Sequence, residues 1–209
     1  MKVLVLCTGN SCRSILAEAI LRDAGFESYS AGSAPAGRVN ENVKRLLEQK
    51  GLWSDEFYSK SIDEVEQYGP FDLVVTVCDN AKEACPTYPG AKTIHMGYPD
   101  PDGKPFEAFE ELFEKMQSEL VEAVKKARHE VEQKEGGVQI KFKGVPASVV
   151  FTMVQNCSEG KCECMSEETK KKIEGMQIDE NSDDVSLHIK GDIKKEEIEA
   201  ALKRSKVLK

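Results

Sequence analysis

The stretch VLVLCTGNSCRSILAEA, from Val3 to Ala19, joins two apolar segments through a short polar loop. Residues 3–6 are a brief apolar run that predicts a buried strand, and the Ile-, Leu- and Ala-rich segment from residue 15 predicts a helix. Small and polar residues fill positions 8–11. A strand, a tight loop and a helix start together aim backbone N–H groups and a helix dipole at one point. The sequence therefore predicts an anion site here.

Cys7 stands at the rim of this predicted site, where a positive field should favour the thiolate and lower the thiol pKa. Arg13 would supply the planar guanidinium that binds a tetrahedral oxyanion, and Ser14 could donate a hydrogen bond to the thiolate. The alternative is that Cys7 is a buried thiol at the end of a core strand. The Cys-x5-Arg-Ser spacing between strand and helix favours the oxyanion site. Its expected binding residues are Thr8, Gly9, Asn10, Ser11, Cys12 and Ser14.

Charge and cysteine content narrow the class of protein. A net charge of -8 over 209 residues argues against nucleic acid as the main partner. No apolar stretch approaches a membrane span, and the chain starts with a strand instead of a signal peptide, so we expect a cytoplasmic protein with no membrane partner. The seven cysteines are odd in number and grouped, which suggests catalytic, redox or metal-binding thiols in a reducing cytosol.

Apolar periodicity predicts alternating strands and helices over about the first 130 residues. The further strands are expected at 27–31, 71–78 and 92–96, and the further helices at 42–50 and 106–132. Such alternation predicts an α/β fold, a parallel sheet with helices on both faces. In these sheets ligands bind beyond the carboxyl ends of the strands. Since Cys7 and Cys78 each follow a strand directly, we expect them to face the same crevice.

Cys78 and Cys85 bracket the hexapeptide DNAKEA, ahead of an irregular loop at 86–90. One interpretation is a pair of unrelated loop cysteines. Two thiols on a loop beside the reactive Cys7 favour a disulfide relay instead, because thiol–disulfide exchange needs each thiolate to reach the next sulfur.

The motifs CTGNSCRS, YSAG, DLVVTVCDNAKEACP and DPDGKP resemble those of the thioredoxin-coupled arsenate reductases, which share the fold of the low-molecular-weight protein tyrosine phosphatases. The resemblance covers roughly residues 1–130. It implies that Cys7 attacks arsenate, that Arg13 binds the arsenate oxygens and that Asp100 protonates the leaving oxygen. It also implies that Cys78 and then Cys85 carry the disulfide away from Cys7. Thioredoxin or a similar dithiol would be the reductant, with no cofactor required.

Some members of the family hold a potassium ion near the catalytic loop, with residues corresponding to Asn10, Glu18, Ser30 and an aspartate. Here Ser61 stands at the aspartate position and Lys60 adds a positive charge. The sequence argues against this potassium site, and Asn10 is expected to hold the loop through hydrogen bonds. Cys12 is expected to have a structural role.

Composition changes after the predicted long helix, where EVEQKEGG is charged and then glycine-rich. We expect a phosphatase-like domain at 1–132, a linker at 133–137 and a small domain at 138–209. Strands are predicted at VQIKFKG and SVVFTMVQN, the second with a helix as the alternative. A helix at 166–174, a hairpin at 175–191 and a final helix after Asp192 complete an α+β, ferredoxin-like order.

Cys157, Cys162 and Cys164 place three thiols within eight positions of this small domain. Zinc usually takes a fourth ligand, whereas three soft thiolates suit copper(I) or trivalent arsenic. A soft metal or arsenite is thus the favoured ligand, with an internal dithiol reductant or a plain metal site as alternatives.

Three functions follow from these observations. Arsenate reduction is favoured, and a low-molecular-weight protein tyrosine phosphatase is the nearest enzymatic alternative. The alternative outside enzymes is a metal- or metalloid-binding protein with a degenerate oxyanion site. The intact set Cys7, Arg13, Cys78, Cys85 and Asp100 argues against degeneracy.

Overall fold

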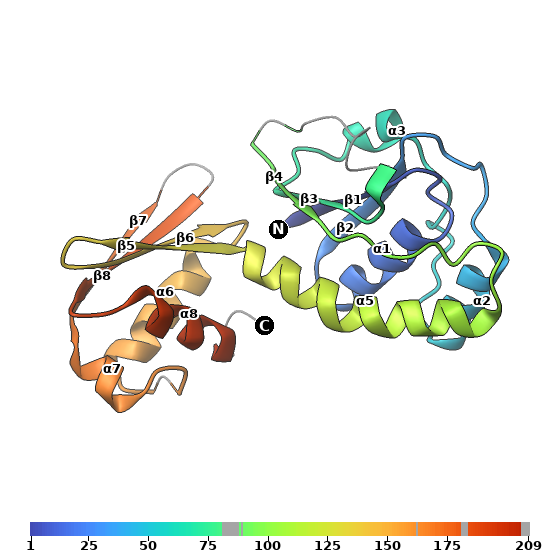
Figure 1. Ribbon diagram of the computed structural model, residues 1–209. Helices are drawn as coiled ribbons and strands as arrows, with labels where there is room; N and C mark the ends of the chain where they lie inside the picture. The colour runs from blue at the N-terminus through green and yellow to red at the C-terminus, as the bar shows by residue number, and fades with distance from the viewer. Residues whose placement is uncertain (81–87, 89, 162, 181–183, 206–209) are drawn as a thin grey trace. The chain divides into compact units, whose positions relative to one another are not determined.

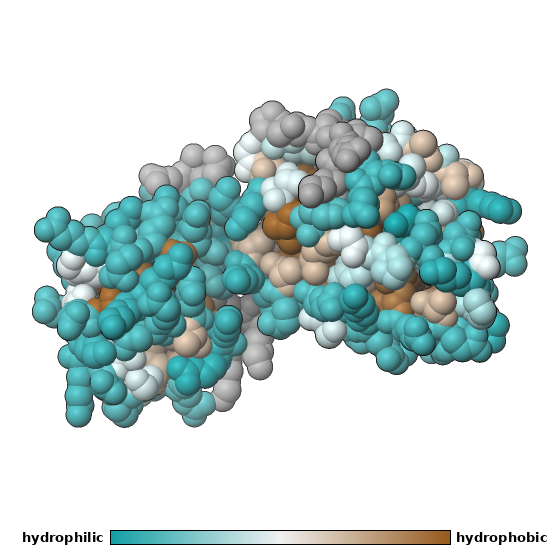
Figure 2. Space-filling model, in the orientation of Figure 1, coloured by the Kyte–Doolittle hydropathy of each residue, from teal (hydrophilic) through white to brown (hydrophobic). Residues whose placement is uncertain are grey.

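A computed structural model describes residues 1–80, 88, 90–161, 163–180 and 184–205. The chain divides into two compact units, 1–124 and 125–209, which are described separately (Figure 1). None of the described helices is both long and apolar enough to cross a membrane. In the view of Figure 2 the surface of the second unit is mostly hydrophilic.

The first unit is built on a parallel sheet with the strand order β2-β1-β3-β4. The strands are β1 (Lys2–Cys7), β2 (Glu27–Gly32), β3 (Leu73–Thr76) and β4 (Lys92–His95). The helices are α1 (Arg13–Asp23), α2 (Glu41–Gln49), α3 (Ile62–Glu66) and α5 (Phe106–Ala127). The predicted α/β class is confirmed.

Helices cover both faces of this sheet, which is why its central strands read as continuous apolar runs. Leu4 and Val74 pack with Val65 of α3 on one face. Because successive strand residues point to opposite faces, the fully buried Val5 and Val75 face the other side, where Figure 1 shows α1 and α5. Because β1 and β3 are parallel neighbours, their carboxyl ends lie at the same edge of the sheet, where α1 begins.

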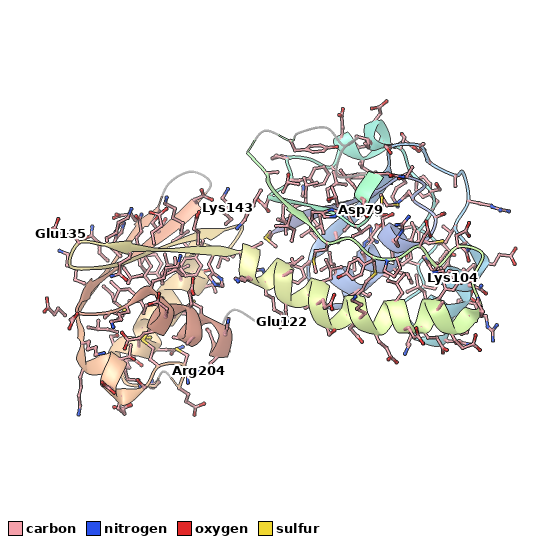
Figure 3. All side chains as sticks on the ribbon, in the orientation of Figure 1. Asp79, Lys104, Glu122, Glu135, Lys143 and Arg204 are labelled. Carbon is pink, nitrogen blue, oxygen red and sulfur yellow. The ribbon has the colours of Figure 1, made fainter. Side chains whose placement is uncertain are left out.

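The predicted long helix ends earlier than the apolar pattern suggested. α5 stops at Ala127 instead of continuing to residue 132, because β5 (His129–Lys134) pairs antiparallel with β6 (Gly137–Lys143). The residues expected as a linker, 133–137, consequently belong to the end of this β-hairpin, where 133–134 and 137 are paired strand residues and 135–136 form the turn, with Glu135 at the tip (Figure 3).

The second unit is an antiparallel sheet in the order β5-β6-β8-β7. Its other elements are α6 (Ala147–Ser158), α7 (Glu167–Lys171), β7 (Ile173–Glu180), β8 (Asp184–Gly191) and α8 (Lys195–Arg204). The segment SVVFTMVQN lies in α6, so the helical alternative was correct for it. The helix expected at 166–174 is shorter, because Ile173 already starts the pairing of β7 with β8.

One face of the second sheet carries the core. Phe142 and Leu187 pack there with Val150 of α6 and Ile198 of α8. The expected order of strand, helix, two strands and helix is present in β6, α6, β7, β8 and α8, with the short α7 ahead of β7. The additional strand, β5, occupies the edge of the sheet next to β6.

Candidate active site

The loop between β1 and α1 turns its carbonyl oxygens outward. Those of Cys7, Thr8 and Gly9 accept backbone hydrogen bonds of 2.8–3.1 Å from the segment 33–36. A peptide whose carbonyl points outward turns its N–H the other way, toward the centre of the loop. The Asn10 N–H shows this, because it donates to the Cys7 Sγ at 3.0 Å. Residues 7–13 thus form a cradle, a loop whose inward N–H groups can hold a tetrahedral anion at the start of α1.

Two unusual backbone positions shape this cradle. Asn10 has φ 44°, in the left-handed region, which asparagine tolerates better than most residues. Gly32, beside Cys7 on β2, approaches the loop so closely that a Cβ there would lie 2.5 Å from the Thr8 oxygen and 3.0 Å from the Asn10 Cβ. The loop can close only against a residue without a side chain.

The Cys7 thiol has hydrogen-bond partners but is almost completely shielded from solvent. Ser14 Oγ lies 2.9 Å from Cys7 Sγ. Burial nevertheless raises the pKa of the Cys7 thiol, and the hydrogen bonds from Ser14 and the Asn10 N–H only partly oppose this effect. The expected lowering of the pKa is wrong for this structure, because Cys7 is only 3% exposed and the cost of removing the thiolate from water dominates.

Arg13, the first residue of α1, contacts the loop that contains Asp100. Its Nη1 donates to the Tyr98 carbonyl at 3.2 Å, and its Nη2 lies 2.5 Å from Asp100 Oδ2. A further hydrogen bond of 2.8 Å, from the Asn40 amide to Asp102 Oδ1, ties this loop to the N-cap residue of α2. The guanidinium and the carboxyl group that the sequence singled out are therefore in direct contact.

Cys78 lies beside the same cradle. It follows β3 by two residues, is buried, and has its Sγ 3.5 Å from the Thr8 hydroxyl oxygen. Cys12 is also buried, and burial raises the pKa of its thiol to about 11. The structure thus brings Cys7 and Cys78 to one edge of the sheet, while the predicted relay partner Cys85 lies outside the described residues.

Comparison with known families identifies the family to which this fold belongs. The sequence pattern described as "Low molecular weight phosphotyrosine protein phosphatase" matches residues 2–135. This chain belongs to that family. The match ends inside the β5–β6 hairpin, so most of the second unit lies beyond it.

Several proteins that this chain resembles are named arsenate reductases. The protein of that name from Brevibacillus brevis is 38% identical over 112 residues, 51% of this chain and 81% of the relative. The one from Halalkalibacterium halodurans is 42% identical over 101 residues, 46% of this chain and 70% of the relative. The solved arsenate reductase from Archaeoglobus fulgidus is 31% identical, has a TM-score of 0.51, and aligns with 58% of this chain and 98% of its own.

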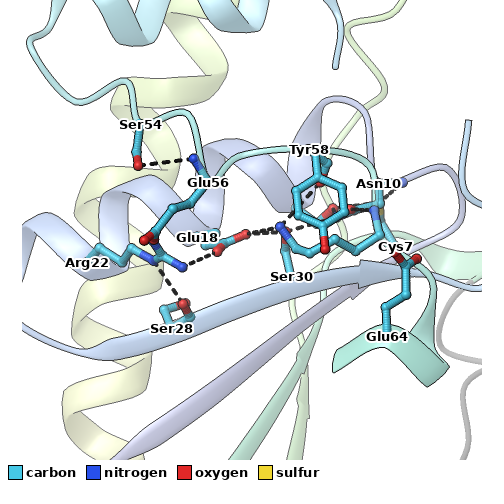
Figure 4. A network of polar contacts seen from close by, with 12 residues as sticks. Cys7, Asn10, Glu18, Arg22, Ser28, Ser30, Ser54, Glu56, Tyr58 and Glu64 are labelled. Carbon is cyan, nitrogen blue, oxygen red and sulfur yellow. Dashed lines mark hydrogen bonds and ion pairs between the residues drawn. The ribbon is translucent and has the colours of Figure 1, made fainter. Parts of the chain in front are cut away.

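Behind the cradle of this phosphatase-family fold lies a buried polar network (Figure 4). Glu18, fully buried, accepts hydrogen bonds from the Ser30 hydroxyl at 2.5 Å and from Arg22 at 2.7 Å. The Lys60 ammonium lies 3.2 Å from Glu18 Oε2. Ser61 points elsewhere, since its hydroxyl caps α3. With an ammonium group and two further donors on the Glu18 carboxylate, this set does not fit a potassium ion.

In the second unit, Cys157 and Cys164 line one cavity of about 290 Å³. Cys157 is a free, half-buried thiol, whereas Cys164 is disulfide-bonded. Cys162 lies outside the described residues, and among the described ones no group of three His, Cys, Asp or Glu is placed to hold a metal. The same cavity is lined by Met153, Met165 and Met176. Sequence reasoning missed these methionines, although Met153 precedes Cys157 by one helical turn.

Proposed function

We propose that this chain is an arsenate reductase that uses a Cys7 nucleophile and a thiol relay. The observation that carries the proposal is the second buried thiol: Cys78 adjoins the cradle in which Cys7 and Arg13 would hold the oxyanion. A phosphatase that only hydrolyses an ester needs the cradle but has no use for that second thiol. The names of the relatives support this choice, whereas the match of the family pattern fits the reductase and the phosphatase equally.

The proposed first step is attack of the Cys7 thiolate on arsenate. A sulfur–arsenic bond forms, an arsenate oxygen leaves as water, and Asp100 supplies a proton to it. Arg13 and the inward N–H groups of the loop neutralise charge on the remaining oxygens. The contact between Asp100 and the Arg13 guanidinium supports this role, because an anion that takes over the guanidinium would release the carboxylate to take up the proton that it then donates.

The proposed second step is attack of the Cys78 thiolate on the Cys7 sulfur. The sulfur–arsenic electron pair stays with arsenic, which falls from the pentavalent to the trivalent state and leaves as arsenite. A Cys7–Cys78 disulfide remains. Cys85 would then attack Cys78 and release Cys7 as a thiol. An external dithiol such as thioredoxin, available in a cytoplasmic setting, would reduce the final disulfide.

The test is arsenite formation from arsenate with a thioredoxin system, measured beside hydrolysis of para-nitrophenyl phosphate. We expect arsenite formation to depend on both thioredoxin and Cys78. Cys78→Ser should abolish reduction and leave any ester hydrolysis, which needs only Cys7 and the cradle. Hydrolysis without arsenite formation in the unmodified protein would favour the phosphatase alternative, and undiminished arsenite formation by Cys78→Ser would remove Cys78 from the mechanism.

For the second unit we propose binding of arsenite or a soft metal such as copper(I). The specific observation is the shared cavity, which is lined by Cys157, Cys164 and three methionines. Thiolate and thioether sulfur are the donors that soft ions prefer. The proposal concerns the reduced protein, and it includes Cys162 as the third thiol.

Titration of the reduced full-length chain with arsenite, copper(I) or zinc tests this binding. Comparison with Cys157→Ser separates the second unit from the thiols of the first. We expect one equivalent of arsenite or copper(I) to be lost in the variant. Uptake that is identical in both proteins, or zinc binding alone, would contradict the proposal.

A further inference from the structure

The cavity of the second unit is larger than an inorganic ion requires. It adjoins the face of the second sheet that α6 and α8 cover (Figure 1), and its volume is about 290 Å³. An apolar cavity of about 150 Å³ already holds a benzene molecule, whereas arsenite consists of one arsenic and three oxygen atoms. Protein interiors are close-packed, and unfilled apolar space lowers stability. The size of the cavity therefore indicates a ligand with an organic part.

The residues that line this cavity range from completely buried to exposed. The apolar ones that are at most 3% exposed include Ile140, Leu187, Ile189 and Ile198. Cys157 and Cys164 are half-buried, and Lys161 and Glu163 are exposed. The cavity therefore runs from the surface into the apolar core, and its two cysteines occupy the intermediate level of burial. A ligand held by these sulfur atoms has apolar space on its inner side.

The three methionines of the cavity suit an organic group better than an arsenic atom. Trivalent arsenic binds a cysteine by exchanging an arsenic–oxygen bond for an arsenic–sulfur bond, and the thiol proton leaves with the oxygen as water. A thioether has no proton to lose and takes no part in this exchange. Methionine side chains adapt their shape, and their sulfur atoms make favourable contacts with aromatic rings. Met153, Met165 and Met176 therefore favour an aromatic group in the cavity.

The number of cysteines agrees with an organic arsenical. Arsenite has three oxygens to exchange for sulfur. A monosubstituted trivalent arsenical, R–As(OH)₂, keeps its arsenic–carbon bond and exchanges only two. Among the described residues, Cys157 and Cys164 are the cysteines that line the cavity. Two thiols and an apolar space match the two oxygens and the one carbon substituent of such a compound.

We propose that the cavity of the second unit binds a trivalent arsenical with an aromatic substituent, through Cys157 and Cys164. Two arsenic–oxygen bonds break, two arsenic–sulfur bonds form, two water molecules leave, and arsenic stays trivalent. Cys164 is disulfide-bonded in this structure. A dithiol reductant such as thioredoxin must therefore first convert Cys164 to a thiol and is itself oxidised to a disulfide. The inference rests on the proposed binding of trivalent arsenic by the second unit and narrows its ligand.

The experiment titrates the reduced full-length chain with three probes: arsenite, methylarsonous acid and phenylarsonous acid. Each probe is measured in competition with dithiothreitol, so that the strength of the arsenic–sulfur bonds largely cancels. The difference between the unmodified chain and Cys157→Ser reports on the second unit, because the thiols of the first unit are the same in both. We expect the phenyl probe to bind there at least about tenfold more tightly than the methyl probe, because it buries more apolar surface.

A substitution in the apolar wall tests where the organic group lies. Ala201 of α8 lines the cavity and is 2% exposed. Ala201→Leu should fill part of the cavity, weaken the phenyl probe about tenfold and leave the methyl probe nearly unchanged. Ala200→Leu is the matched control, because Ala200 is exposed on the same helix. If Ala201→Leu does not fold, the comparison of the phenyl and methyl probes in the unmodified chain decides alone.

Cys162→Ser separates this inference from the proposed arsenite site with three thiols. We expect this variant to keep the phenyl probe and to bind arsenite less tightly. Loss of the phenyl probe in Cys162→Ser, or a phenyl probe that binds no more tightly than the methyl probe, would overturn the inference. Arsenite uptake that depends on Cys157 would then still support the soft-ion site. Tight phenyl binding without arsenite uptake would keep the inference and remove inorganic arsenite as the ligand.

Discussion

Arg13 and Asp100 form an ion pair with Nη2 and Oδ2 2.5 Å apart, although 87 positions separate them in the chain. The guanidinium is thus directed by a carboxylate from another loop before any substrate anion is bound. An incoming oxyanion must compete with Asp100 for the donors of Arg13. In the proposed mechanism, the bound anion displaces Asp100 from Arg13, and the released carboxyl group donates a proton to the leaving oxygen.

This contact predicts that one substitution, at Asp100, affects two steps in opposite ways: anion binding is kept or strengthened, and the chemical step slows. Asp100→Asn removes a competing negative charge, so phosphate or sulfate should bind at least as tightly as to the unmodified protein. Formation of the Cys7 adduct should slow by about 10²–10⁴, the usual contribution of a general acid. Anion titration and rapid-quench mass spectrometry measure the two effects. Adduct formation at unchanged speed would leave Asp100 with only the turn-forming role that Asp-Pro-Asp-Gly also suits.

The relay predicts distinct products for its two outer cysteines. Cys7→Ser should abolish all turnover, because it removes the thiol that lies in the cradle. Cys85→Ser should allow about one turnover and trap a Cys7–Cys78 disulfide, because the next exchange step is missing. Peptide mass spectrometry after arsenate addition identifies the trapped bond. Sustained turnover by Cys85→Ser would exclude that residue from the mechanism.

The raised pKa of Cys7 predicts alkaline activation. Below its pKa, the thiolate fraction of a cysteine grows about tenfold for each pH unit. Alkylation of Cys7 should therefore keep rising through neutral pH and level off only above the range of an ordinary cysteine. Cys12, with a pKa of about 11, should level off late as well. A plateau for Cys7 in the acidic range would instead indicate a thiolate stabilised by the loop.

Gly32→Ala should lower the stability of the first unit, because Gly32 packs against the cradle from β2. The new Cβ would lie 2.5 Å from the Thr8 oxygen, and such overpacking typically costs about 1–3 kcal/mol. Urea unfolding can be followed through Trp53, the single tryptophan, which reports on the first unit. The unmodified protein is the reference. Equal stability of Gly32→Ala and the unmodified protein would show that β2 can withdraw from the loop.

The sequence predicted the placement of residues well where a local pattern determines the geometry. The apolar run, the glycine-containing loop and the helix start were enough to place Cys7 and Arg13. The strand that precedes Cys78 was enough to bring that residue to the same edge. The pKa direction of Cys7 was missed, since burial depends on segments such as 33–40 that lie far along the chain from the motif. Partnerships such as Lys60 with Glu18 also need tertiary structure.

Patterns near element ends were less informative. The helical periodicity of α5 continues past Ala127, and only the pairing of His129 with Phe142 shows that a strand has begun. The glycine pair at 136–137 is as typical of a hairpin turn as of a linker, and sequence alone does not distinguish them. The methionines around Cys157 come from separate elements, so no spacing could have indicated their shared cavity.

The hairpin of β5 and β6 also determines where a gene that encodes this chain can be divided without splitting a sheet. One residue, Arg128, separates α5 from β5, and its N–H and carbonyl are both bonded, to Lys125 and Lys143. A gene truncated at the glycine pair would encode a protein that retains β5 without β6 and exposes Val131, which is 4% exposed beside its partner Ile140. A stop codon directly after Ala127 keeps α5 whole and separates the two halves at the position where neither loses a strand.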